Sequence, residues 1–161
     1  MIKNRNCKRS DSLGFTLIEL LAVTAIIAIL ASIAVSKLYS AIDQAKISKA
    51  IAEITELHNT VEMYRVMNDG ELPLQISDLI PQFYQSVPDD PWGTPYVYNN
   101  FTQIPPGQKR KDGPLVPINK EYDIFSNGPN KATTPNIRST NGKDDIILAN
   151  DGAFIDVAEK Y

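Results

Sequence analysis

Glu19 is the residue whose chemistry and position are hardest to reconcile. From Gly14 to Val35 the sequence reads GFTLIELLAVTAIIAILASIAV, and Glu19 is the only ionisable side chain in it. A carboxylate inside the hydrocarbon of a membrane is costly and therefore needs a partner. The run holds no Lys, Arg or His, but a cut before Phe15 would create a free amino group four residues from Glu19. We therefore expect a processed membrane anchor in which Glu19 makes an assembly contact.

Groups that could support enzyme catalysis are few. The single His58 lies among polar and charged residues of a predicted helix, and the single Cys7 lies near the amino terminus. Nucleophilic catalysis needs a base beside its nucleophile, and the sequence has neither a Gly-rich phosphate loop nor a GxSxG motif. The carboxylates of Asp89 and Asp90 are adjacent, so in a strand they would point apart. We therefore expect a protein that is not an enzyme.

Charge is divided unevenly along the chain. Residues 1–14 carry four basic residues and Asp11, a net charge of +3, whereas the remainder carries 12 basic and 18 acidic residues, a net charge of −6. A basic segment before an apolar run is typical of a head held at the cytoplasmic face while the rest of the chain is translocated. The acidic remainder argues against nucleic acid as a partner.

The order of these segments predicts where the chain is cut. Gly14 precedes the apolar run, so cleavage after it would remove residues 1–14 as a leader peptide and leave the anchor attached. The alternative is an uncleaved signal anchor in which Glu19 snorkels to the interface. Cleavage would also remove Cys7, so the mature chain could form no disulfide. In an exported domain of this size, a metal ion is then an alternative source of stability to look for.

One long helix is predicted after the leader. The run Phe15–Val35 has 21 residues, and about 20 cross the core of a bilayer as a helix. Apolar residues then recur every three or four positions, at Ile47, Ile51, Ile54, Leu57, Val61 and Tyr64. We assign residues 15–36 to a transmembrane and assembly half and residues 37–68 to an amphipathic half. Asn68-Asp69-Gly70 should end the helix.

Residues 70–161 have the texture of a small globular head. All 11 prolines lie beyond Gly70, and short apolar runs alternate with turn signals. The predicted fold class is α+β, a long amino-terminal helix packed on a small antiparallel sheet. A short helix is expected at Ile76–Phe83 and a surface loop at Gln103–Pro117. The expected strands are Tyr96–Tyr98, Tyr122–Phe125, Ile146–Ala149 and Ala153–Val157.

The segment GFTLIELLAV resembles the processing site of type IV prepilins and of type II secretion pseudopilins. The resemblance implies a type IV pilin-like fold and cleavage of the Gly14–Phe15 bond by a membrane prepilin peptidase, which also methylates the new amino group of Phe15. It further implies that Glu19 pairs with a subunit terminal amine during fibre assembly. Many family members have proline where Ser36 stands, and proline kinks a helix. With Ser36, this helix is expected to run straighter.

Beyond the anchor, three segments resemble the major pseudopilin of type II secretion. They are DGELP (Asp69–Pro73), DPWGTPYVY (Asp90–Tyr98) and YDIFSNGPN (Tyr122–Asn130). The resemblance implies a structural subunit that polymerises through its amino-terminal helix and drives export of folded proteins across the outer membrane. One alternative is a type IV pilin for adhesion, motility or DNA uptake. Another is a monomeric membrane-anchored binding module.

The resemblance also implies partners and a location. The partners would be further copies of the chain, minor pseudopilins, the prepilin peptidase, and an inner-membrane assembly platform driven by a cytoplasmic ATPase. The chain would cross the bacterial inner membrane once, with its head in the periplasm, and then enter a periplasmic pseudopilus.

A calcium site is the last feature that the resemblance implies. Major pseudopilins hold calcium in the loop after the segment that YDIFSNGPN resembles, and Ca²⁺ takes six to eight oxygen ligands. Asn130 stands where the family usually has aspartate, so the site should be weaker. The alternative is that these are surface turn residues. The candidate ligands, separated by a flexible loop at Lys131–Lys143, are Asn127, Asn130, Asp144 and Asp145.

Overall fold

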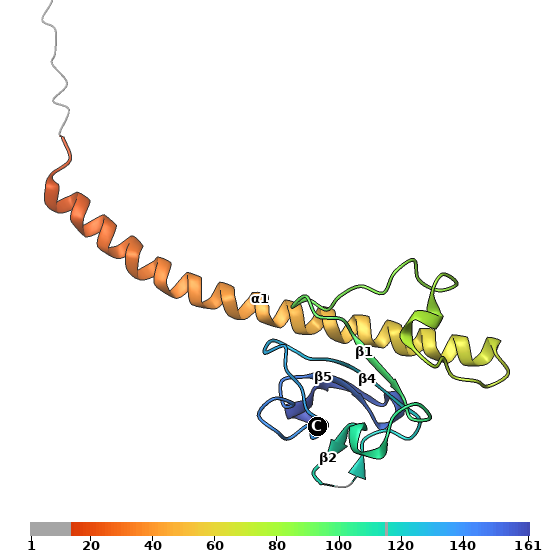
Figure 1. The fold of residues 1–161 in the computed structure, drawn as a ribbon. Coiled ribbons are helices and arrows are strands. Elements are labelled where there is room, and N and C mark those ends of the chain that lie inside the picture. The colour runs from red at the N-terminus through yellow and green to blue at the C-terminus, as the bar shows by residue number, and fades with distance from the viewer. Residues whose placement is uncertain (1–13, 115) are drawn as a thin grey trace, which may run out of the picture. The chain divides into compact units, whose positions relative to one another are not determined.

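The computed structural model of the chain describes residues 14–114 and 116–161 (Figure 1). Except for Gly14, the predicted leader lies outside the described residues. The contacts within the chain divide it into two compact units, with the boundary between Ala41 and Ile42. The helix α1, Leu17–Met67, contributes residues to both units, so its two parts are described separately.

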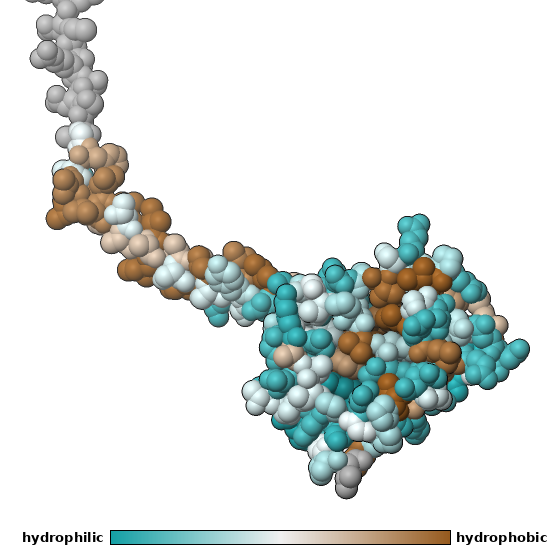
Figure 2. Space-filling model, in the orientation of Figure 1, coloured by the Kyte–Doolittle hydropathy of each residue, from teal (hydrophilic) through white to brown (hydrophobic). Residues whose placement is uncertain are grey.

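The first part of α1 is an apolar helix with no buried side chain. Its most apolar 18-residue window has a mean hydropathy of 2.6, so by length and composition this stretch could cross a membrane. Figure 2 shows apolar residues along it. The hydroxyls of Thr24, Ser32 and Ser36 donate to helix carbonyls three residues earlier, at distances of 2.7–3.0 Å. Such internal hydrogen bonds satisfy polar groups that lipid cannot, and α1 continues through Ser36 without interruption.

The second part of α1 packs on the sheet through the face that the spacing predicted. Ala50, Ile54, Leu57 and Val61 are buried, and Ile47, Ile51 and Tyr64 pack against them at the edge of the same core. The helix ends at Met67, and the Gly70 N–H donates to the Arg65 carbonyl at 2.9 Å. The stop at Asn68-Asp69-Gly70 is therefore confirmed, with Asp69 and Gly70 both at positive φ.

A four-stranded antiparallel sheet forms the centre of the head. Its strand order is β1-β4-β5-β6, so every neighbouring pair except β1 and β4 is also consecutive along the chain. The predicted α+β class, with a helix against a small antiparallel sheet, is confirmed. The strand bounds are Val97–Asn100 for β1, Tyr122–Ser126 for β4, Ile146–Ala149 for β5 and Phe154–Val157 for β6.

Both faces of this sheet are buried. Tyr122, Ile124 and Leu148 contribute to the core under α1, whereas Phe125 and Ile147 contribute to a second core on the opposite face. The second core is completed by residues from connecting segments, namely Ile118, Ile137 and Ala158. This arrangement explains why every residue of β4 and β5 is buried and why neither strand alternates in polarity.

Two connections differ from the sequence-based prediction. The helix expected at Ile76–Phe83 is a 3₁₀ helix limited to Ile76–Leu79, and Pro81 follows it. The expected surface loop Gln103–Pro117 contains a 3₁₀ helix at Pro106–Gln108 and the paired two-residue strands β2 and β3, Lys111–Asp112 and Val116–Pro117. It also contains a buried side chain, that of Arg110. Two further 3₁₀ helices lie at Asn150–Gly152 and Ala158–Lys160.

Asp90 fixes the turn that leads into β1. Its carboxylate accepts hydrogen bonds from the backbone N–H groups of Trp92 and Thr94, at 3.0 and 2.8 Å. It also accepts from the hydroxyls of Thr94 and of Ser126 in β4, at 2.6 and 2.5 Å. Burial raises the pKa of Asp90, but the four hydrogen bonds outweigh burial and hold the pKa below its ordinary value.

Replacing Asp90 should therefore destabilise the head. We expect Asp90→Ala to lower the free energy of unfolding by about 3 kcal/mol, because it leaves buried donors without an acceptor. Denaturant unfolding of the full chain in detergent, followed by fluorescence of the single Trp92, would measure this. The matched control is Asp89→Ala at the exposed neighbouring position. Equal losses in the two variants would contradict the stabilising role of Asp90.

Candidate functional site

In the anchor, the structure brings Thr16 and Glu19 together. The Thr16 backbone N–H and hydroxyl both donate to Glu19 Oε2, at 2.9 and 2.7 Å. The Glu19 N–H donates in return to Thr16 Oγ1 at 3.3 Å. Because α1 begins at Leu17, Thr16 is the N-cap and Glu19 the third helical residue. The pair is thus a capping box, which the spacing T-x-x-E in FTLIE could have revealed.

The capping box places the Glu19 carboxylate at the start of the helix. A negative charge is favourable there because unpaired backbone N–H groups point out of the helix amino terminus. Phe15, which a cut after Gly14 would make the first residue, directly precedes the cap and is exposed. The predicted processing site and the predicted assembly residue therefore share one short exposed segment.

In the head, sheet register explains the position of two of the four candidate calcium ligands. Ser126 at the end of β4 is paired with Ile146 at the start of β5. In an antiparallel pair, the next residues outward, Asn127 and Asp145, are then neighbours. Gly128, the residue after Asn127, lies at positive φ and so close to the Asp144 carbonyl that a Cβ atom would collide with it. Glycine is therefore required at this position.

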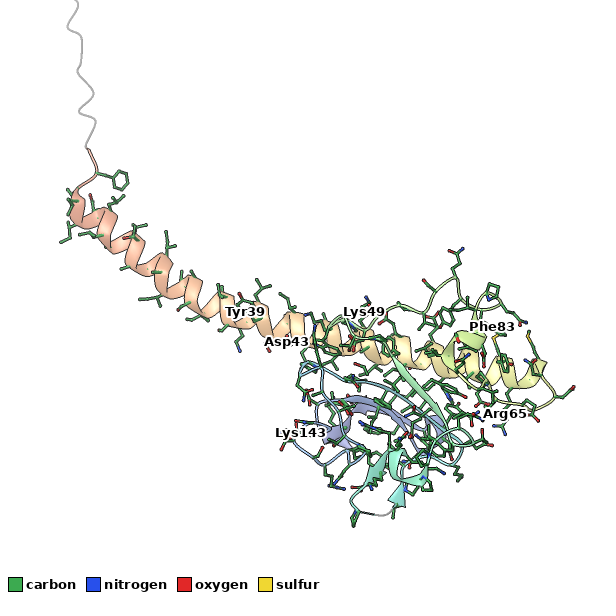
Figure 3. The ribbon with its side chains drawn as sticks, in the orientation of Figure 1. Tyr39, Asp43, Lys49, Arg65, Phe83 and Lys143 are labelled. Atoms are coloured by element: carbon green, nitrogen blue, oxygen red, sulfur yellow. The ribbon has the colours of Figure 1, made fainter. Side chains whose placement is uncertain are left out.

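The other two candidate ligands also meet. The Asn130 side-chain amide donates to Asp144 Oδ1 at 2.6 Å, and its backbone N–H donates to Asp144 Oδ2 at 3.2 Å. Lys143, labelled in Figure 3, directly precedes Asp144 and is exposed. The structure therefore brings the four residues into two adjoining pairs.

The oxygen atoms at this site fit a calcium ion in kind. Asn127 Oδ1 and Asp145 Oδ1 are buried and have no hydrogen-bond partner among the described residues, and both are oxygen atoms of the type that calcium binds. Over residues 14–114 and 116–161, however, no three His, Cys, Asp or Glu side chains form a metal-binding group. A calcium ion here would depend on amide and backbone oxygens for its remaining ligands.

Arg110 is the residue of this site that sequence reasoning missed. Its Nη2 group donates to Asp145 Oδ2, which also accepts from the Thr133 hydroxyl at 2.5 Å. The side chain of Arg110 is 2% exposed and that of Asp145 is 0% exposed. Burial raises the pKa of Asp145 to about 6, although Arg110 and Thr133 favour the carboxylate. Nothing in the run QKRKD distinguishes Arg110 from the lysines beside it.

Asp123 is a second carboxylate in this network. Its Oδ2 accepts from the Arg110 backbone N–H at 2.7 Å and its Oδ1 accepts from the Asn119 side-chain amide at 2.9 Å. Burial raises its pKa to about 6. Asp123 lies in β4, so the network ties the connection before β4 to the sheet itself.

His58 differs from the solvated residue that the sequence suggests. It is half-buried, and its Nδ1 lies 2.7 Å from the Tyr122 hydroxyl, which donates to Glu62 Oε1 at 2.7 Å. Arg65, labelled in Figure 3, forms an ion pair with Glu121 at 2.8 Å nearby. These residues line a polar hollow of about 320 Å³ between α1 and the sheet. The role of His58 in this geometry is to join the helix to β4.

The anchor first defines the class of protein. Residues 9–35 match the family model described as the prokaryotic N-terminal methylation motif. The matched segment contains Gly14 and Phe15 of the predicted processing site and Thr16 and Glu19 of the capping box.

Relatives that match beyond the anchor then define the family. The chain is 32% identical over 137 residues to type II secretion system core protein G of Aeromonas hydrophila. The alignment covers 75% of this chain and 85% of that protein. It is 31% identical over 137 residues to the protein of the same name from Pseudomonas aeruginosa, covering 75% and 86%. The chain is 30% identical over 132 residues to the protein of the same name from Escherichia coli, and that alignment covers 72% of this chain and 81% of the Escherichia coli protein. The chain therefore belongs to the family of type II secretion system core protein G. No solved structure gives a significant match.

Proposed function

We propose that the processed chain is the structural subunit of a type II secretion pseudopilus and has no enzymatic activity. It polymerises through its amino-terminal helix to drive export of folded proteins across the outer membrane. The observation that carries the proposal is the apolar stretch of residues 14–35, which has no buried side chain and whose single ionisable residue, Glu19, is held at the first turn of α1 by Thr16. Membership of the core protein G family supports the same function.

The proposed sequence of events begins with processing. A prepilin peptidase cuts between Gly14 and Phe15 and methylates the new amino group of Phe15. Glu19 then pairs with the terminal amine of a neighbouring copy as the subunit leaves the membrane. Because the core of packed helices in a filament has a low dielectric constant, this attraction is stronger than it would be in water.

The proposed location follows from the apolar helix and the family. The chain waits in the bacterial inner membrane, which it crosses once, with its head in the periplasm. An assembly platform with a cytoplasmic ATPase then adds it to a pseudopilus that also contains minor pseudopilins. Nucleic acid is not a proposed partner, since the chain after the leader is acidic.

A secretion assay tests this function against the alternative of a surface pilus. A deletion of the gene in its own host should leave exported proteins in the periplasm and deplete them from the medium. Expression of the intact chain should restore their export. Normal secretion together with loss of surface fibres, adhesion, motility or DNA uptake would contradict the proposal and favour a type IV pilin.

Calcium is a proposed ligand of the head. Asn127, Asn130, Asp144 and Asp145 would hold it, and it would supply positive charge to a loop with two neighbouring carboxylates. The two buried oxygen atoms without partners support this assignment. Asn130, an amide where the resemblance leads us to expect a carboxylate, lowers the charge of the site and should weaken the binding of the ion.

An Asp144→Ala variant tests the calcium proposal. We expect it to reduce calcium affinity at least about tenfold, since it removes one of two adjacent carboxylates. Direct calcium titration of the full chain in detergent measures this affinity. Asp112→Ala, which removes a carboxylate outside the candidate ligand set, is the control. An unchanged calcium response in the Asp144 variant would end the proposal.

A further inference from the structure

The side chain of Arg110 contacts the loop between β4 and β5 at two places. Its Nη1 group donates to the Thr133 hydroxyl and, at 2.7 Å, to the Thr134 carbonyl. Its Nη2 group donates to the carboxylate of Asp145. A single guanidinium thus contacts a side chain and a backbone carbonyl in the middle of the loop and a carboxylate at its end. Multiple oxygen contacts to one positive centre are what a metal ion provides in such loops.

Arg110 is buried in the head and packs against the sheet. Among the described residues it is the only basic residue that is buried, and its guanidinium carbon lies 4.3 Å from the centre of the Phe125 ring. A buried guanidinium is costly unless its charge is paired, and Asp145 supplies that pairing. The fork of donors in arginine suits several oxygen acceptors at once, which a lysine ammonium on a flexible stem does less well.

The residues after Arg110 attach to the same loop. The Lys111 N–H donates to the Pro135 carbonyl at 2.9 Å, and the Lys111 carbonyl accepts from the Ile137 N–H at 3.1 Å. Asp112 then pairs with Arg138, whose Nη2 donates to Asp112 Oδ2 at 2.7 Å. The segment 110–112 therefore lies along one side of the β4–β5 loop. It is held there by hydrogen bonds within the chain.

We infer that Arg110 acts as an internal cation that takes over part of the task of a bound calcium ion. It neutralises Asp145 and holds the β4–β5 loop in shape, so the head remains folded without metal and calcium adds little stability. Removing the guanidinium leaves Asp145 unpaired beside Asp144 and Asn127, and makes the loop dependent on calcium. The predicted dependence on calcium rests on the calcium proposal. The pairing of Arg110 with Asp145 does not.

The experiment compares calcium responses of the full chain in detergent. Melting temperatures are measured by Trp92 fluorescence in excess calcium and in a chelator for the wild type, Arg110→Gln and Arg138→Gln. The wild type should lose about 2 °C or less in chelator, and Arg110→Gln about 8 °C or more. Arg138→Gln removes an exposed positive charge from the same loop. Because an exposed ion pair contributes little to stability, this variant should respond to calcium as the wild type does.

Each outcome decides the inference. A larger calcium response in Arg110→Gln than in both other proteins supports it, as does a variant that folds only when calcium is present. Equal responses in the three proteins, or a wild type that unfolds in chelator, would overturn it. If Arg110→Gln fails to fold in either buffer, Arg110→Lys takes its place. The lysine keeps the positive charge but cannot contact Thr133, Thr134 and Asp145 together, so its loop should still depend on calcium more than the wild-type loop does. A calcium response equal to that of the wild type then overturns the inference. Direct calcium titration of the wild type tests the calcium proposal separately. If the wild type binds no calcium, the calcium proposal fails, whereas the inference about Arg110 is decided by the melting temperatures of the three proteins.

Discussion

A chain carrying Glu19→Ala is expected to be cleaved and inserted into the membrane but to be missing from filaments. The change leaves the Gly14–Phe15 bond and the apolar helix intact, and it removes the carboxylate proposed to pair with a neighbour's terminal amine. A charge pair in a low-dielectric interior is strong, and each 1.4 kcal/mol corresponds to about tenfold in occupancy. We expect incorporation to fall at least about tenfold, measured as the fraction of processed chain in sheared filaments.

Two matched variants separate assembly from helix capping. Thr16→Ala removes the partner that holds Glu19 in the capping box, and Thr24→Ala removes a hydroxyl from the same apolar stretch. If Glu19 acts on a neighbour, Thr16→Ala should reduce incorporation only a few-fold and Thr24→Ala should have no effect. Loss of incorporation in Thr16→Ala as severe as in Glu19→Ala would show that capping alone accounts for the role of Glu19. Normal incorporation of Glu19→Ala would contradict the pairing proposal.

A Gly14→Val substitution is expected to block processing altogether. A β-branched side chain beside the scissile bond is bulky and stiff, and it would occupy space that glycine leaves open. Within the described chain, a Cβ atom at Gly14 meets nothing within 4 Å. The substitution therefore should not disturb the subunit, and its effect should lie in recognition by the peptidase. Mass spectrometry should find residues 1–14 still attached, an unmethylated Phe15 and no filament.

The control for this variant is another glycine with open space around it. A Cβ atom at Gly107, which lies in the head, would also meet nothing within 4 Å, so Gly107→Val should be processed as the wild type is. Cleavage of Gly14→Val at the wild-type rate would contradict the assignment of the Gly14–Phe15 bond. Cleavage at another bond would do the same.

The long helix could be predicted from sequence because its signals are local. The apolar run after Gly14 and the spacing from Ile47 to Tyr64 each identify one face of a helix within a few turns. The stop at Gly70 is equally local, since glycine tolerates a positive φ. The strands β4 and β5 were also predictable as apolar runs. Their burial on both faces was not, because Ile118 and Ile137 reach the second core from the irregular connections on either side of β4.

The site in the head could be predicted only in part, because its interactions are long-range. Asn127 and Asp145 were candidates by residue type, and the register of β4 and β5 explains why they are neighbours. The pairing of Asp145 with Arg110 joins positions 35 residues apart. A basic residue between two lysines in a segment rich in Pro and Gly carries no sign that it is buried. The capping box of Thr16 and Glu19, by contrast, is a local signal that the spacing T-x-x-E carries.

Crosslinking along the anchor helix tests the central claim of assembly most directly. A photo-crosslinking residue is placed at one exposed position at a time, Leu20, Ile27 or Ile33, in cells that contain the secretion machinery. A structural subunit that polymerises through this helix should give ladders of chain-to-chain products, which the Glu19→Ala background should greatly reduce. A processed, membrane-inserted chain that gives only uncrosslinked monomer at all three positions would contradict assembly and identify a monomeric membrane-anchored module.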